Sequence, residues 1–137
     1  MTVLRYVGVY LLTFAVFMVA DLVWLSTVAL NFYTGNIGAS RMQIPPIWPV
    51  AIAFYLLYVA GVLVIVVLPA AHSGDMWKAV LFGALFGLVA YATYDLTNWS
   101  TLKDWPAIVS VVDMLWGTVL TTIVATAGYF IARWLGA

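Results

Sequence analysis

Long apolar runs, broken only by short polar turns, make up nearly all of this chain of 137 residues. A helix needs about 20 apolar residues, each rising about 1.5 Å, to cross the hydrocarbon core of a bilayer. Only 7% of the residues are charged, whereas a soluble domain carries about 25%. The pattern therefore predicts an all-α integral membrane protein.

Four runs are long enough to span, and they predict a single transmembrane domain over 1–137, a four-transmembrane-helix bundle. The predicted spans are about 4–30, 47–68, 77–98 and 106–134. Pro49 and Pro106 suit helix starts, where a missing N–H costs little, and Pro69 suits a helix end. The connection 31–46 contains Gly, Asn and a Pro pair, which predicts turns. Whether it lies on the membrane surface or folds over the helix ends stays open.

The two halves of the chain share a short pattern. Asp-Leu is followed by Trp and Ser at Asp21 and again at Asp95, and Trp-Pro opens the helix that follows each time. These matches suggest two parallel helical-hairpin repeats.

The basic residues give the predicted orientation. If the N-terminus is cytoplasmic, the cytoplasmic side of the membrane carries Arg5, Lys78 and Arg133, and the opposite side carries Arg41 and Lys103. Because cytoplasmic loops are richer in Lys and Arg, we expect the N- and C-termini to be cytoplasmic.

Several classes of function are excluded by composition. The chain has no Cys and a single His, so it has neither a disulfide nor a site that needs two imidazoles. No cluster of Lys or Arg exists, so we expect no nucleic acid partner. No cofactor and no metal are predicted.

Three acids lie within the predicted spans: Asp21, Asp95 and Asp113. Helical rise and the alternating direction of the spans place all three in the same half of the membrane, with Asp113 about 10 Å in from the start of its helix. Asn98 belongs to the same layer. Each ionised side chain near the bilayer centre costs about 2.5–3.5 kcal/mol. Burial and mutual repulsion favour the protonated acid, so at least one should be neutral or share a proton.

Helical spacing predicts which faces meet. Gly83, Gly87, Tyr91 and Asp95 recur every four residues, and a G-x-x-x-G pair lets another helix approach closely. Similar stripes carry the other two acids and place an aromatic residue near each. We therefore predict two sets of site residues. The binding or proton-titrating residues are Asp21, Asp95, Asn98 and Asp113, and the pocket walls are Trp24, Tyr91, Tyr94 and Trp116. The plainer alternative is that the acids join helices by hydrogen bonds and that the tryptophans only pack.

Four motifs resemble a bacterial membrane family known as domain of unknown function 2177. They are D-x-x-W at Asp21–Trp24, Y-D-L-T-N at Tyr94–Asn98, T-L-K-D-W-P at Thr101–Pro106 and D-x-x-W-G at Asp113–Gly117. The resemblance covers nearly the whole chain and implies a small protein of the bacterial inner (cytoplasmic) membrane. It supplies no catalytic residues.

The leading hypothesis is a protein that binds or transports a small amphipathic or lipid-like molecule in an intramembrane pocket. Its partners would be membrane lipids and such a small-molecule ligand, and a homodimer is plausible because one bundle encloses little volume. One alternative is a membrane enzyme that acts on a lipid, with Asp as general acid and base or as ligand of Mg²⁺. Another is a structural or accessory subunit of a larger membrane complex.

Overall fold

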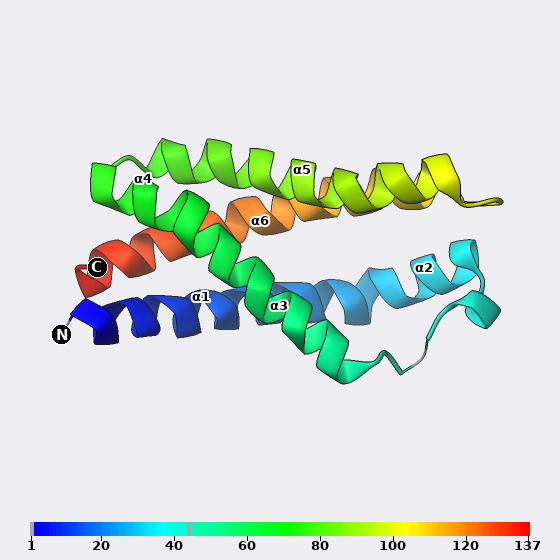
Figure 1. The fold of residues 1–137 in the computed structure, drawn as a ribbon, viewed down its shortest axis with the longest axis horizontal. Coiled ribbons are helices and arrows are strands. Elements are labelled where there is room, and N and C mark those ends of the chain that lie inside the picture. Colours follow the sequence, from blue (N-terminus) through cyan, green and yellow to red (C-terminus); the bar gives the residue numbers. More distant parts are fainter. Residues whose placement is uncertain (1, 44) are drawn as a thin grey trace.

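The computed structural model describes residues 2–43 and 45–137, and helices account for almost all of them. Figure 1 shows long rods lying side by side, with the N- and C-termini together at one end. Four helical segments of the described chain are long and apolar enough to cross a membrane: Thr2–Ile37, Trp48–Ser73, Met76–Thr101 and Ala107–Leu135. The predicted four-helix membrane bundle is confirmed.

The first segment consists of α1 (Thr2–Trp24), a π-helical turn η1 (Leu25–Ala29) and α2 (Leu30–Ile37). The sequence predicts turns from residue 31 onward, but the helix continues to Ile37. Within this extension of the helix, the side chains of Thr34 and Asn36 each donate a hydrogen bond to the backbone carbonyl oxygen four residues earlier. Gly38 then ends the helix with a positive φ of 101°, which costs glycine little. The remaining connection holds one 3₁₀ turn, η2 (Ala39–Arg41).

The second segment consists of α3 (Trp48–Val62), a second π-helical turn η3 (Leu63–Val67) and α4 (Leu68–Ser73). The sequence predicts an end at Pro69, yet the helix passes through it. The π turn that ends two residues before Pro69 explains the difference, because a locally wider turn accommodates the proline ring and its missing N–H. Gly74, in the left-handed conformation, ends the helix instead.

The last two helices, α5 (Met76–Thr101) and α6 (Ala107–Leu135), pack against each other more extensively than any other pair of described elements. By contrast, α3 crosses the bundle obliquely: it begins beside α1, and its continuation into α4 ends beside α5 (Figure 1). The two hairpins therefore pack differently, and the internal repeat stays a prediction from sequence.

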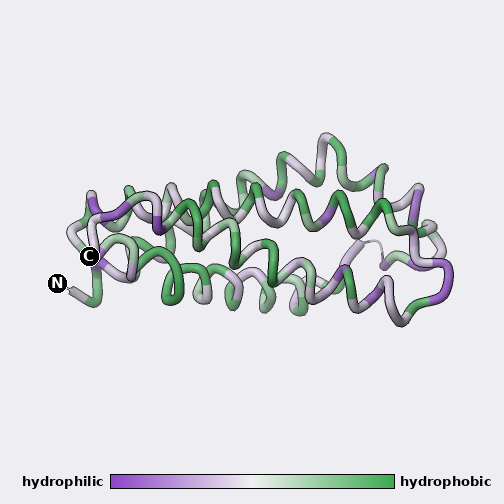
Figure 2. The backbone as a smooth tube through the Cα atoms, turned by 90° about the horizontal axis from the view of Figure 1, so that it is seen from above, coloured by the Kyte–Doolittle hydropathy of each residue, from purple (hydrophilic) through white to green (hydrophobic). Residues whose placement is uncertain are grey.

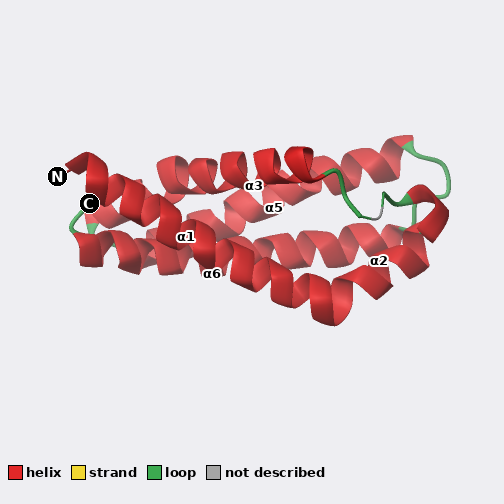
Figure 3. Ribbon diagram, turned by 90° about the horizontal axis from the view of Figure 1, so that it is seen from below, coloured by secondary structure: helices red, strands yellow, loops and turns green. Residues whose placement is uncertain are grey.

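The surface between the two ends is apolar. Figure 2 shows strongly hydrophilic segments gathered at both ends of the molecule, with few between them. Leu57, Leu81 and Leu115 are 74%, 67% and 63% exposed, as expected for side chains that face lipid. The connecting loops lie at the same two ends (Figure 3).

At the end that holds the termini, two arginines bind helix C-termini. Arg5 donates to the carbonyl oxygen of Gly136 at 3.3 Å, and Arg133 donates to that of Ala71 at 3.5 Å. Cations are favourable there because the last carbonyls of a helix are unpaired and carry partial negative charge.

Candidate functional site

The candidate site is built around polar side chains on α6 that meet partners from the other helices. From the loop end inward they are Ser110, Asp113, Trp116 and Thr121. The chain folds this way locally because these residues follow one face of a regular helix, together with Gly117. This face forms a polar stripe inside an otherwise apolar bundle.

Asp113 bonds to the first segment. The hydroxyl of Tyr33, on α2, donates to Asp113 Oδ1 at 2.7 Å. The buried carboxyl of Asp95, on α5, lies beside that of Asp113. Asp95 is fully buried, and neither of its side-chain oxygens accepts a hydrogen bond from the described residues. Two of the predicted acids therefore form a close carboxyl pair.

Asp21 occupies the next position inward. It accepts a long hydrogen bond of 3.4 Å from Trp116 Nε1, and it lies beside the hydroxyl of Tyr55 on α3. The ring of Trp116 stacks on Trp24, with centroids 4.6 Å apart and planes at 7°. Trp24 Nε1 is buried and finds no acceptor within the part of the chain described. The stacked pair holds α1 against α6 at the level of the acids.

Ser110 connects the turn between α5 and α6 to this layer. It accepts from Trp105 Nε1 at 2.9 Å and donates to the backbone carbonyl oxygen of Asp95 at 2.9 Å. Asp104, within the turn, has a positive φ of 58°, a conformation that Asp and Asn tolerate better than most residues. The turn is thus fixed directly against the residue that bears the buried carboxyl.

Small residues allow α5 and α6 to approach closely enough for these contacts. A Cβ added to Gly83 would lie 2.7 Å from that of Ala125, and one added to Gly87 would overlap the carbonyl oxygen of Gly117. Both glycines are buried. The G-x-x-x-G prediction is confirmed, and its face is the one that carries Asp95.

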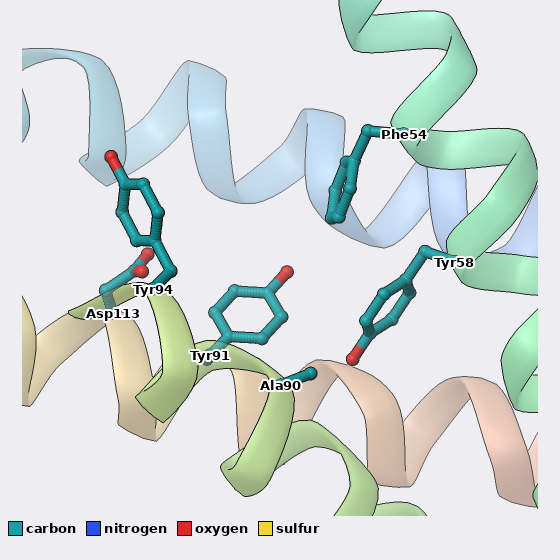
Figure 4. A pocket seen from close by; sticks show the side chains of 6 residues that line it. All are labelled: Phe54, Tyr58, Ala90, Tyr91, Tyr94 and Asp113. Carbon is teal, nitrogen blue, oxygen red and sulfur yellow. The ribbon is translucent and has the colours of Figure 1, made fainter. Parts of the chain in front are cut away.

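A cavity of about 370 Å³ lies beside the acids, between α3, α5 and α6. It is lined by Phe54, Tyr58, Ala90, Tyr91, Tyr94 and Asp113. Figure 4 shows the aromatic rings and the Asp113 carboxyl arranged around this space. The hydroxyl of Tyr58 forms a hydrogen bond of 2.7 Å with Thr121 Oγ1, and this bond fixes the orientation of the Tyr58 ring. Cavities that bind small molecules occupy about 300–1,000 Å³.

The predicted site residues occupy different positions around this cavity. Tyr91, Tyr94 and Asp113 line it, whereas Asp95 and Asp21 lie behind it in the polar layer. Trp24 and Trp116 stack on each other and do not belong to the lining. Asn98 is half-buried one turn beyond Tyr94 and lies beside it.

Sequence reasoning missed Phe54, Tyr58 and Ala90 in the lining of the cavity, and Tyr33, which bonds to Asp113. Phe54 stands in a helix that is apolar on every side, so no periodicity marks its face. Tyr33 follows the π turn η1. In an unbroken α-helix it would point about 120° away from Asp21, but the additional residue of a π turn reduces this difference to about 30°.

The site lacks basic groups. All five Lys and Arg side chains are exposed. Two of them, Arg5 and Arg133, donate to backbone carbonyl oxygens at helix C-termini. Within the described ranges, no group of three or more His, Cys, Asp or Glu side chains is placed to hold a metal ion. The carboxyl layer is therefore surrounded by neutral donors, chiefly tyrosine and tryptophan.

The fold and this site together define a small four-helix membrane protein with a carboxylate at a partly open aromatic cavity. The chain belongs to the family described as "Predicted membrane protein (DUF2177)", whose family model matches residues 6–130. The family indicated by the sequence motifs is confirmed. No curated protein and no solved structure matches the chain.

Proposed function

We propose that this membrane protein binds a small amphipathic molecule in the cavity between α3, α5 and α6. The observation that carries the proposal is the composition of the lining. Four aromatic rings offer an apolar surface, and Asp113 is the one ionisable acid among the lining residues. The aromatic rings would hold the apolar body of the ligand, and the carboxylate would hold its polar head.

The charge of the site favours a cationic head. Three acids lie in one layer, and none of the exposed Lys or Arg side chains neutralises it. Aromatic faces attract cations as well, by roughly 0.5–2 kcal/mol depending on how far the cation is desolvated. An organic cation would satisfy both features, whereas an anion of the same shape would be repelled.

The test is equilibrium binding of tetraphenylphosphonium to protein in phosphatidylcholine nanodiscs, with empty nanodiscs as baseline. Tetraphenylborate, which has the same shape and the opposite charge, is the matched control ligand. Asp104→Asn is the matched control variant, because it makes the same chemical change in the exposed turn and Asn tolerates its positive φ.

We expect wild type and Asp104→Asn to bind the cation and not the anion, and Asp113→Asn to bind it at least about tenfold more weakly, a loss of about 1.4 kcal/mol. Equal binding by Asp113→Asn, or no binding by wild type, would refute the proposal. A transport role predicts in addition that the wild type, reconstituted in liposomes, moves the cation across the bilayer faster than protein-free liposomes do, and that Asp113→Asn does not.

A further inference from the structure

The carboxyl pair Asp95–Asp113 is an unusual arrangement that the proposed ligand site alone does not explain. Asp95 is 0% exposed, so a ligand in the cavity does not reach it. Both of its oxygens lack a hydrogen-bond partner among the residues described. The group it faces is another carboxyl, that of Asp113. Unpaired buried polar atoms are costly, and more so when they are charged.

The groups around the pair come from every neighbouring helix. They are Asp21 on α1, Tyr33 on α2, Tyr91 and Tyr94 on α5 and, next to Asp21, Tyr55 on α3. None of them is basic. Two ionised carboxylates side by side would repel each other here, and neither could donate to the other. A single proton removes both difficulties, because the acid then donates a hydrogen bond to the carboxylate.

We propose that Asp95 and Asp113 share one proton when the cavity is empty, and that an organic cation bound at Asp113 displaces that proton. The second half of this proposal rests on the proposed function, and the first half does not. Asp113 is the member of the pair that lines the cavity. Asp95 acts through it, as the group that holds the proton.

The exchange balances in atoms and charge. The ligand-free pair consists of one carboxylic acid and one carboxylate, with a net charge of −1. When the cation enters, the O–H bond of the acid breaks and the proton leaves to water. The site then holds two carboxylates and one cation, again with a net charge of −1. The bundle therefore never carries two unbalanced negative charges at this position, which burial would penalise heavily.

The first experiment needs no ligand. Infrared spectra of wild type, Asp95→Asn and Asp104→Asn at neutral pH report the C=O stretching band of protonated carboxylic acids and its shift in D₂O. We expect wild type and Asp104→Asn to show the band, and Asp95→Asn to lose it, because an amide at 95 can donate to an ionised Asp113. An unchanged band in Asp95→Asn, or no band in wild type, overturns the shared proton.

The second experiment is calorimetric titration with tetraphenylphosphonium in phosphate and in Tris, whose ionisation enthalpies differ. The difference in heat gives the number of protons released. We expect about one proton per cation for wild type, and an affinity that falls by about tenfold for each unit of decreasing pH. For Asp95→Asn we expect binding with almost no proton release and little pH dependence.

The outcomes separate the two proposals. Wild-type binding without proton release overturns the exchange and leaves the ligand site intact. Proton release that persists in Asp95→Asn assigns the proton to another group and also overturns it. If the cation does not bind at all, the proposed function fails, and the infrared spectra still decide whether the pair shares a proton.

Discussion

Replacement of Gly117 by Ala should reveal how closely the helices must approach to form the cavity. An added Cβ would overlap Cγ and both Cδ atoms of Tyr91. These atoms form the near end of the ring, so rotation of the ring about its own axis does not relieve the clash. Either Tyr91 adopts another χ1 rotamer and leaves the cavity wall, or α5 and α6 separate.

The magnitude follows from two opposing effects. Overpacking typically costs about 1–3 kcal/mol, and the upper part of this range applies because backbone or rotamer must move. Replacing Gly by Ala within a helix stabilises the folded protein by about 0.5–1 kcal/mol. We therefore expect Gly117→Ala to lower the free energy of unfolding by about 1–2 kcal/mol and to weaken tetraphenylphosphonium binding as well.

The effect of Gly117→Ala on the free energy of unfolding should change sign once the ring of Tyr91 is removed. In a Tyr91→Ala background the clash is absent, so Gly117→Ala should raise the unfolding free energy by up to about 1 kcal/mol. Unfolding by sodium dodecyl sulfate in mixed micelles, followed by far-ultraviolet circular dichroism, measures all four proteins of this cycle. Gly35→Ala is the control, because nothing lies within 4 Å of its added Cβ. Equal destabilisation in both backgrounds would refute the reasoning.

Three further predictions concern separate parts of the molecule. Tyr33→Phe removes the donor to the carboxyl pair and should speed amide hydrogen exchange in α2, whereas unchanged exchange would show that the bond does not hold this segment. Trp105→Phe should lower the unfolding free energy by about 0.5–1.5 kcal/mol, and the loss should largely vanish in a Ser110→Ala background; additive losses would show that the two do not interact. Because the chain has no Cys, Ser40→Cys and Ser73→Cys can each be labelled alone. With cytoplasmic termini, an impermeant maleimide added outside intact cells should label Ser40→Cys only, and the reverse pattern would invert the orientation.

The packing face of α5 could be predicted from the sequence because the helix is regular along its whole length. Gly83, Gly87, Tyr91 and Asp95 recur every four residues, and one unbroken period of 3.6 residues places them together. The same reasoning holds for α6. Where the period is constant, the identity of the face follows from residue spacing alone, and so does the depth of each acid along the helix.

The remaining part of the site depends on where the period breaks. The π turn η1 rotates Tyr33 toward Asp113, where the two side chains form a hydrogen bond. Within the turn, Ser26 and Thr27 both donate to the carbonyl oxygen of Val23, but such bonds also occur in unbroken helices and so do not predict a π turn. Spacing also places Trp24 and Trp116 in the polar layer, but it does not distinguish two rings that stack on each other from two rings that line a cavity.

The hydrogen-bond donors to the acids are neutral, so they leave the negative charge of the carboxylates unbalanced. Asp113 accepts from a tyrosine and Asp21 from a tryptophan, and both donors are neutral. Such donors satisfy lone pairs without cancelling the charge, whereas Arg or Lys would do both. A layer that served only to join helices would be more stable with a basic partner, since an isolated buried charge is costly. Neutral donors around clustered acids are what the proposed exchange requires, in which a proton supplies the positive charge when the cavity is empty and a ligand supplies it when the cavity is filled.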